Sequence, residues 1–312
     1  MPTDTRPPLV VIVGPTAVGK TEVAIQLASR LNGEIVSADS RLFYRWMDIG
    51  TAKPTPEQRQ QVTHHLIDIV EPDDPLSLAT FQNAARQAIS TIHERRHLPF
   101  LVGGTGQYIH AVIEAWQVPA VEPQPALRRV LERWAQQISP EGLHARLAVL
   151  DPEAAMRIEP RNLRRTVRAL EVILSTGLRF SEQRLRIPSP YRTLILGLNR
   201  PRQELYARVD DRIQGMFDAG FVDEVRDLLS RGFSPELPAL SAIGYREIVN
   251  YLSGKTGLDE AIAQIKRKTR IFVRRQANWF KRDDAEILWF DLRPGTLDEM
   301  EGIIRTWLSQ FR

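Results

Sequence analysis

The sequence predicts an α/β protein in which a parallel sheet with a phosphate-binding loop is interrupted by an all-helical insertion. Three observations lead to this fold class. Short aliphatic runs alternate with helical patterns in the N-terminal third, a glycine-rich loop follows the first of these runs, and a long proline-punctuated stretch contains helical patterns only. Alternating strands and helices are typical of a parallel sheet, and a stretch without strands predicts a separate helical unit.

The first part of the core is predicted to span residues 1–117. The run LVVIV at 9–13 is aliphatic, mostly β-branched and followed by glycine, which predicts a buried strand. The segment EVAIQLASRL at 22–31 repeats apolar residues at the helical period. Two further strands are expected at 34–37 and 100–102, and a helix is expected between them at 79–96.

The pattern changes between residues 118 and 192. Prolines at 119, 123 and 125 punctuate the chain, and helical patterns at 126–137 and 162–174 occur without a convincing strand. We interpret 118–192 as a helical insertion. The core is expected to resume over 193–312, with strands at 193–198 and 287–291, long helices at 202–231 and 259–282, and a terminal helix.

Composition and charge narrow the class of protein. The 312 residues are 43% hydrophobic and 26% charged, enough for a sizeable core, and the formal net charge is +4. The absence of cysteine excludes disulfides, cysteine-ligated zinc and a thiol nucleophile. The N-terminal apolar run is far too short for a signal sequence or a membrane span, so we expect no membrane insertion, a cytoplasmic location and, by default, a monomer.

The phosphate loop is the strongest chemical signal. Residues 14–21 read GPTAVGKT, which fits GxxxxGK[ST] and lies between a predicted strand and a predicted helix, the context that this motif requires. Glycines let backbone N–H groups turn towards phosphate, a lysine neutralises charge, and a threonine hydroxyl ligates Mg²⁺. The predicted phosphate-binding residues are Gly14, Pro15, Thr16, Ala17, Val18, Gly19, Lys20 and Thr21, with Thr21 as the metal ligand.

Asp39 is a candidate base or metal partner. A nucleotide kinase usually adds a magnesium-binding aspartate after a hydrophobic strand, but the strand at 100–102 leads into GGTG without an acid. Asp39 instead follows the strand at 34–37, on the edge where open α/β sheets bind ligands. From position alone Asp39 could equally cap a following helix, and both interpretations stay open.

Six blocks of the sequence can be compared with known families. They are GPTAVGKT at 14–21, VSADSRLFYRWM at 36–47, DIGTAKP at 48–54, VGGTGQY at 102–108, GFVDEVR at 220–226 and AIGYRE at 242–247, and a basic segment ending RQANWF at 275–280 follows them. Together these blocks resemble the tRNA isopentenyltransferase family, the tRNA dimethylallyltransferases, and they occur in the family's order. DIGTAKP is far more specific than a phosphate loop alone.

The resemblance implies substrates and roles. The substrates would be dimethylallyl diphosphate and the adenosine immediately 3′ of the anticodon in tRNA, modified on its exocyclic amine, with Mg²⁺ as cofactor and diphosphate in the phosphate loop. Asp39 would be the general base. Thr21, Lys20 and Arg226 would stabilise the departing diphosphate, and the helical insertion would grip the anticodon stem-loop.

The tRNA contacts that we expect come from the resemblance together with the basic clusters of the chain. Three positions depart from the family's usual pattern, because Leu42 stands where many members have Gln, Trp46 where a small residue is common, and Gln107 where an apolar residue is usual. The expected contacts are Asp39, Ser40, Arg41, Leu42, Thr105, Gln107, Arg161, Arg164, Arg165, Arg168, Gly244, Tyr245, Arg246, Arg270, Arg274, Arg275, Gln276 and Trp279.

Two basic clusters suit RNA binding. Residues 266–282 hold eight basic residues and no acid, and on one continuous helix Arg267, Arg270, Arg274 and Lys281 would share a stripe, interleaved with Phe272, Trp279 and Phe280. Phosphates attract Arg and Lys, and unstacked bases stack on aromatic rings. The alternative is a solvated helix face. The second cluster, in the insertion, has a stronger alternative of internal pairing with nearby glutamates, and comprises Arg157, Arg161, Arg164, Arg165 and Arg168.

Three other functions are alternatives to prenylation of tRNA. A small-molecule kinase with an arginine-rich lid is disfavoured by the acid-free GGTG strand end. An isopentenyltransferase acting on free adenine nucleotides would not need the long insertion or the basic helix. A non-catalytic RNA-binding protein would not need Lys20, Thr21 and Asp39 together. The pair His64 and His65 is interpreted as structural, because adjacent side chains point apart and no third metal ligand has matching spacing.

Overall fold

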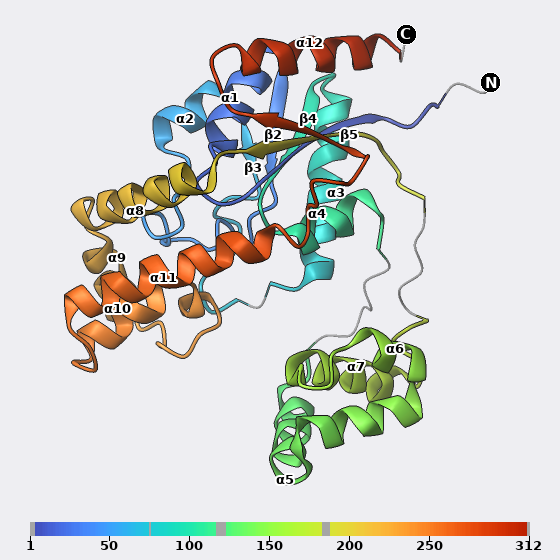
Figure 1. Ribbon diagram of the computed structural model, residues 1–312, viewed down its shortest axis with the longest axis vertical. Coiled ribbons are helices and arrows are strands. Elements are labelled where there is room, and N and C mark those ends of the chain that lie inside the picture. Colours follow the sequence, from blue (N-terminus) through green and yellow to red (C-terminus); the bar gives the residue numbers. More distant parts are fainter. Residues whose placement is uncertain (1–3, 75, 117–122, 183–187, 311–312) are drawn as a thin grey trace. The chain divides into compact units, whose positions relative to one another are not determined.

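The computed structural model describes residues 4–74, 76–116, 123–182 and 188–310, which form two compact units (Figure 1). The larger unit comprises Met1–Leu76, Phe81–Ile113 and Ser189–Arg312. The smaller unit comprises Ser77–Thr80 and Glu114–Pro188. Its main part differs by about four residues at each end from the insertion of 118–192 expected from the sequence.

The larger unit is built on a six-stranded sheet with the order β3-β2-β4-β1-β5-β6. All neighbouring strands are parallel, and Val10 of the central strand β1 pairs with Phe100 on one side and Leu194 on the other. Residues 9–13 are fully buried, as expected for a parallel strand covered on both faces. The strands are β1 Pro8–Val13, β2 Gly33–Ser37, β3 His64–His65, β4 Leu98–Val102, β5 Arg192–Asn199 and β6 Ile287–Asp291.

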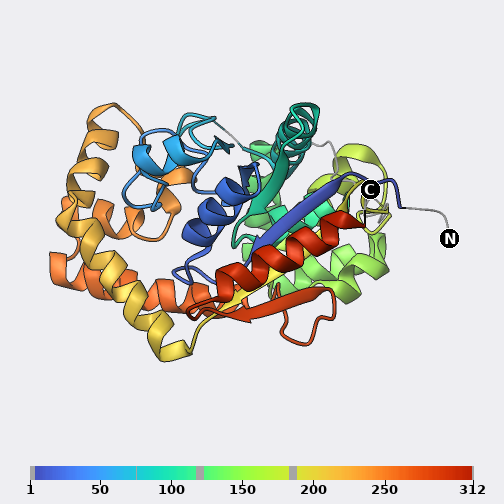
Figure 2. The ribbon, with the colours of Figure 1, turned by 90° about the horizontal axis from the view of Figure 1, so that it is seen from above.

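Helices of the larger unit fall into two groups. The first and last, α1 and α12, lie side by side against the sheet (Figure 2), where Arg30 bonds Asp298 at 2.7 Å. Helices α8 to α11 gather beyond the carboxyl ends of the strands (Figure 1). The helices of this unit are α1 Lys20–Arg30, α2 Pro56–Gln61, α3 Leu78–Glu94, α4 Gly106–Ile113, α8 Arg202–Asp218, α9 Phe221–Ser230, α10 Tyr245–Leu252, α11 Leu258–Gln276 and α12 Thr296–Ser309.

The smaller unit is helical and has its own core. Its helices are α5 Pro125–Leu150, α6 Pro152–Arg157 and α7 Leu163–Thr176. Ser139 has a non-helical backbone (φ 69°, ψ 161°) and Pro140 follows it, so α5 is two helical segments joined at a kink. The buried core residues of the unit are Leu131, Ala135, Leu143, Leu147, Ala155, Ile158, Val167, Ala169 and Leu170.

The structure corrects two helices expected from the sequence. The segment 202–231 is two helices, because Gly220 has a φ of 94° and turns the chain between them. The helix expected over 259–282 ends at Gln276. The predicted stripe that continues to Lys281 is therefore wrong, and Trp279 and Phe280 lie in the turn after the helix. The short elements β3, α2, α4, α6 and α10 were not expected at all.

None of the described helices is long and apolar enough to cross a membrane.

Candidate active site at the carboxyl edge of the sheet

The phosphate loop turns sharply between β1 and α1. Gly14 has a φ of 147°, and a Cβ atom there would lie 2.6 Å from the carbonyl oxygen of Leu198, so only glycine fits. Gly19, with a φ of 110°, precedes α1 and has no side chain to cap it. The N–H groups of the first turn of α1 are thus left for a ligand, and the positive end of the helix dipole points the same way. This geometry matches the anion site expected from the motif.

Lys20 is folded back onto the loop. Its ammonium donates hydrogen bonds to the carbonyl oxygens of Gly14 at 2.9 Å and of Pro15 at 2.8 Å. Desolvation lowers the pKa of Lys20 to about 8, and Asp39 opposes this shift while Arg212 adds to it. The charged form of Lys20 therefore lacks a full counter-charge in this structure.

Three arginines bring positive charge to this loop from β5 and α8. Arg200 Nε donates to the carbonyl of Val18 at 3.0 Å, and Arg208 Nε donates to that of Ala17 at 2.9 Å. Arg212 lies one helical turn beyond Arg208, solvent reaches its side chain, and it makes no hydrogen bond or ion pair with the described residues. Desolvation and the charge of Arg208 lower the pKa of Arg212, and the nearby Asp39 raises it.

No sequence motif indicates these arginines, and the family resemblance predicts Arg226 in their role. The structure places Arg226 on α9, with 59% of its side chain exposed and its guanidinium paired with Asp223. Arg212, in contrast, interacts electrostatically with both Lys20 and Asp39. The available signal was the pair Arg208 and Arg212, four apart on the helix that follows a strand predicted to belong to the core.

Asp39 is a local turn residue with one free oxygen. Its Oδ1 accepts the backbone N–H of Arg41 at 3.1 Å. No helix begins between residues 38 and 55, so the helix-cap interpretation is wrong. Within the described chain, Oδ2 of Asp39 accepts no hydrogen bond, and the side chain is half-buried. A carboxylate oxygen is therefore available beside the cations of the phosphate loop.

The loop after β4 contacts the phosphate loop through Gln276. Gln276 is 5% exposed, accepts the backbone N–H of Thr16 at 2.8 Å and donates to the carbonyl of Gly104 at 3.2 Å. It was predicted to contact tRNA, but the structure places it inside the protein. Trp279, predicted with it, is 37% exposed and packs close to Gly106.

Glu224 joins three of the sequence blocks into one cluster. Its carboxylate accepts the backbone N–H groups of Asp48 at 2.8 Å, Ile49 at 2.6 Å and Gly50 at 3.1 Å. It also accepts the hydroxyl of Tyr245 at 2.6 Å. The DIGT loop is thereby fixed to α9 and α10, so Tyr245, predicted to contact tRNA, is a buried anchor.

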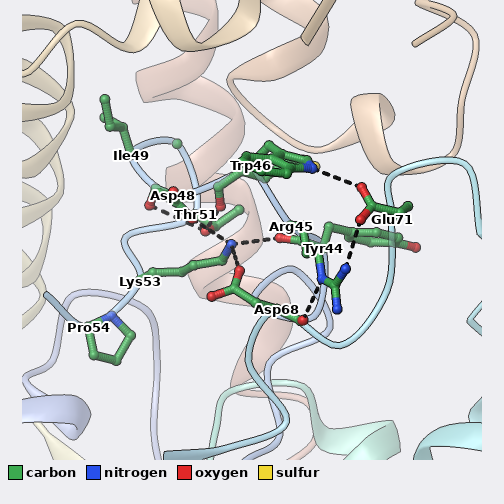
Figure 3. A network of polar contacts seen from close by, with 12 residues as sticks. Tyr44, Arg45, Trp46, Asp48, Ile49, Thr51, Lys53, Pro54, Asp68 and Glu71 are labelled. Carbon is green, nitrogen blue, oxygen red and sulfur yellow. Dashed lines mark hydrogen bonds and ion pairs between the residues drawn. The ribbon is translucent and has the colours of Figure 1, made fainter. Parts of the chain in front are cut away.

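Lys53 holds the other end of the same loop (Figure 3). Its ammonium, with only 2% of the side chain exposed, donates to the carbonyl of Tyr44 at 2.6 Å and to the carboxylates of Asp48 at 2.6 Å and Asp68 at 2.5 Å. All three of its donor positions are used. Nearby, Trp46 Nε1 donates to Glu71 at 2.8 Å, so the unusual tryptophan is held in place on the surface (Figure 3).

A basic groove of about 400 Å³ lies between α8 and α11. The segment 266–282 contains no acid, but acids of other helices pair with it, because Arg270 bonds Asp210 and Lys268 bonds Glu247. Arg274 and Arg275 are exposed at the end of α11. The residues that line the groove are Arg202, Tyr206, Ala263, Lys266, Arg267, Arg270 and Arg274.

The insertion arginines are divided by their partners. Arg157 pairs with Glu153, Arg161 with Glu141 at 3.0 Å, and Arg168 with the buried Glu171 at 2.6 Å. Among the described residues, Arg164 and Arg165 form no ion pair and their side chains are exposed. These two are the cations of the cluster that remain for RNA.

The remaining expected tRNA contacts differ in exposure. Gln107 and Arg246 are exposed, Ser40, Arg41, Leu42 and Thr105 are half-buried, and Gly244 is buried.

His65 Nε2 lies 2.6 Å from the buried carboxylate of Glu34. No group of three or more His, Asp or Glu side chains that could hold a metal occurs in the described part of the chain.

Comparisons of the sequence with known proteins match isopentenyl and dimethylallyl transferases. A family model described as IPP transferase matches residues 42–283, and one described as isopentenyl transferase matches residues 7–72. A tRNA dimethylallyltransferase of Roseiflexus sp. (strain RS-1) is 55% identical, covering 97% of this chain and 99% of the relative. A tRNA dimethylallyltransferase of Thermomicrobium roseum is 49% identical, covering 95% and 90%.

Solved structures with the same fold come from a bacterium and a eukaryote. The tRNA isopentenylpyrophosphate transferase of Bacillus halodurans is 42% identical with a TM-score of 0.73, covering 97% of each chain. A eukaryotic dimethylallyltransferase, described as acting on tRNA, is 27% identical with a TM-score of 0.78, covering 96% of this chain and 77% of the other.

Proposed function

Since the chain belongs to the IPP transferase family and transfers a dimethylallyl group to tRNA, we propose that the donor is dimethylallyl diphosphate and the acceptor is the exocyclic amine of the adenosine 3′-adjacent to the anticodon. One observation carries the finer assignment. The free oxygen of Asp39 lies within electrostatic range of Lys20 and Arg212, so a base and a diphosphate cradle share one edge of the sheet.

The leaving group is stabilised by the phosphate loop. When the allylic C–O bond breaks, negative charge grows on the diphosphate oxygens and positive charge on the allyl carbon. Amides of the first turn of α1, the ammonium of Lys20 and the guanidinium of Arg212 then stabilise the transition state more than the ground state. Arg212 replaces Arg226 in this role, because Arg226 is exposed on α9 and paired with Asp223.

Asp39 acts on the nucleophile. The lone pair of the exocyclic amine is delocalised into the adenine ring, so the nitrogen is a poor nucleophile and attack is helped by a base that accepts its proton. As the new N–C bond forms, the free carboxylate oxygen of Asp39 takes that proton, and the bonding electrons of the broken C–O bond leave with diphosphate. The target base must leave the anticodon loop stack to reach this edge of the sheet.

Mg²⁺ is the proposed cofactor, and the hydroxyl of Thr21, at the start of α1, is the protein group that would hold it. The donor set fits, because Mg²⁺ at phosphate sites keeps several waters and takes few protein oxygens. The ion supplies charge neutralisation on the diphosphate. With Thr21 as the residue that would hold the ion, the carboxylate of Asp39 would stay available for proton transfer.

Exposed cations provide the proposed tRNA surface. Arg274, Arg275 and Arg246 are exposed in the larger unit, and Arg164 and Arg165 are exposed in the smaller one. The α8–α11 groove adds further cations without a balancing acid for each of them. Such surfaces bind phosphates without sequence preference, which leaves selection of the adenosine to contacts at the base.

The experiment that tests this function compares acceptors. The purified protein is incubated with Mg²⁺, dimethylallyl diphosphate and either unmodified tRNA or a mixture of AMP, ADP and ATP, and the products are analysed by mass spectrometry. We expect one dimethylallyl adduct, on the adenosine next to the anticodon, and none on the free nucleotides. Prenylation of free nucleotides alone, or turnover of ATP without prenylation, contradicts the proposal.

A further inference from the structure

Gln276 connects the two loops that border the proposed diphosphate site. Its Oε1 accepts the backbone N–H of Thr16, in the phosphate loop, at 2.8 Å, and its Nε2 donates to the carbonyl of Gly104, after β4, at 3.2 Å. Only 5% of the residue is exposed. A carboxamide suits this place because it accepts on one side and donates on the other without carrying charge.

The loop after β4 is shaped around this contact. A Cβ atom on Gly104 would lie 2.4 Å from Gln276 Nε2 and 3.3 Å from the carbonyl oxygen of Gly14. A Cβ atom on Gly106 would lie 2.3 Å from the Trp279 ring. The glycines of GGTG therefore allow the end of α11 to approach the phosphate loop closely. The sequence signal of a glycine-rich strand end thus reports contact with another part of the chain.

The last turn of α11 has two faces with different surroundings. Arg274 and Arg275 are exposed, while Gln276 is buried against the phosphate loop. Any movement of this turn moves the carboxamide that holds Thr16. Gly19, at the other end of the phosphate loop, has no side chain, so it neither caps α1 nor holds the loop as Gln276 does.

We propose that Gln276 is a positioning residue that sets the shape of the phosphate loop for diphosphate. The proposal rests on the proposed function, because it takes diphosphate as the ligand of residues 14–21. Gln276 touches no reacting atom in this account. It fixes the Thr16 amide, and with it the curvature of the loop that presents the neighbouring N–H groups and Lys20. Loss of both hydrogen bonds should weaken diphosphate binding and leave the tRNA surface unchanged.

The test uses Gln276→Met, which keeps side-chain length and apolar packing but removes both hydrogen bonds, with Gln276→Ala as a second variant. Gln264→Ala is the matched control, because Gln264 lies on the same helix and bonds only Glu260, at 3.0 Å, within the described chain. Calorimetry measures the Kd of inorganic diphosphate with Mg²⁺, filter binding measures the Kd of tRNA, and steady-state kinetics measures KM for dimethylallyl diphosphate.

We expect Gln276→Met to raise the Kd of diphosphate and the KM of dimethylallyl diphosphate by about tenfold, the loss expected for one net hydrogen bond to a binding loop. The tRNA Kd should change less than about twofold, and the control should match the unaltered protein. Unchanged diphosphate affinity in Gln276→Met and Gln276→Ala overturns the inference. If the unaltered protein itself fails to bind diphosphate, the proposed function fails instead.

Discussion

The hydroxyl of Tyr245 donates to the carboxylate of Glu224 at 2.6 Å, and the same carboxylate receives three consecutive backbone N–H groups of the DIGT loop. Burial and the charge of Glu224 raise the pKa of Tyr245 well above its usual value, so the hydroxyl keeps its proton. The blocks DIGTAKP, GFVDEVR and AIGYRE are therefore linked in space by one half-buried acid, Glu224.

Tyr245→Phe tests this link. The substitution removes a hydrogen bond to a charged group, so we expect the free energy of unfolding to fall by about 1.5 to 3 kcal/mol. Urea denaturation measures the change, and Tyr251→Phe is the control on the same helix, α10. Equal stabilities of Tyr245→Phe and the unaltered protein would show that Glu224 holds the loop without the tyrosine.

Lys20→Ala and Thr21→Ala should damage diphosphate handling and spare tRNA binding. Both side chains lie at the start of α1, next to the phosphate loop, where the proposed function places the leaving group and not the RNA backbone. Calorimetry with diphosphate and filter binding with tRNA separate the two effects. A comparable loss of both affinities would argue against the division of the site into a diphosphate cradle and an RNA surface.

Lys20 also predicts a pH dependence. Its pKa in the free protein is lowered to about 8 by desolvation, so the ammonium is charged below pH 8 and loses its charge as the pH rises above it. Diphosphate affinity should therefore be nearly constant from about pH 7 to the pKa and then fall with increasing pH. The Lys20→Arg variant, whose side chain stays charged, should keep a flat profile over this range. A fall of equal size in both proteins would assign the titration to another group.

Arg274→Ala and Arg275→Ala should weaken tRNA binding broadly. Each lost phosphate contact should flatten the slope of log Kd against log salt by about 0.7 to 0.9. Arg226→Ala is the control, because Arg226 is exposed but already paired with Asp223. If the affinity and the slope match those of the control, the end of α11 is a solvated face.

The sequence predicted the sheet better than the helices that complete the site. Segments such as 9–13 and 194–198 are continuous runs of buried, mostly aliphatic residues, a pattern that the local sequence reports directly. The end of α11 at Gln276 depends on contacts with Thr16 and Gly104, which are far away in the sequence. Apolar periodicity alone therefore predicted a helix that extends past its actual end at Gln276.

Contacts between distant parts of the chain also explain why Arg226 was predicted beside the phosphate loop and Arg212 was not. Arg226 belongs to a recognisable block, but its side chain is exposed and pairs with Asp223. Arg212 stands in a stretch without a distinctive motif, and only the packing of α8 beside the phosphate loop reveals its place near Lys20 and Asp39. The motif therefore indicated where the phosphate loop lies, whereas the arginine beside Lys20 and Asp39 could be identified only from the fold.

The most direct test of the account is the single-turnover rate of Asp39→Asn on saturating tRNA and dimethylallyl diphosphate. Asparagine keeps the size of the side chain and can still accept the N–H of Arg41, but it cannot take a proton. We expect normal tRNA affinity and melting temperature with a rate lowered by roughly 10²- to 10⁴-fold. A loss below about threefold, with both substrates bound, would contradict the assignment of Asp39 as the general base.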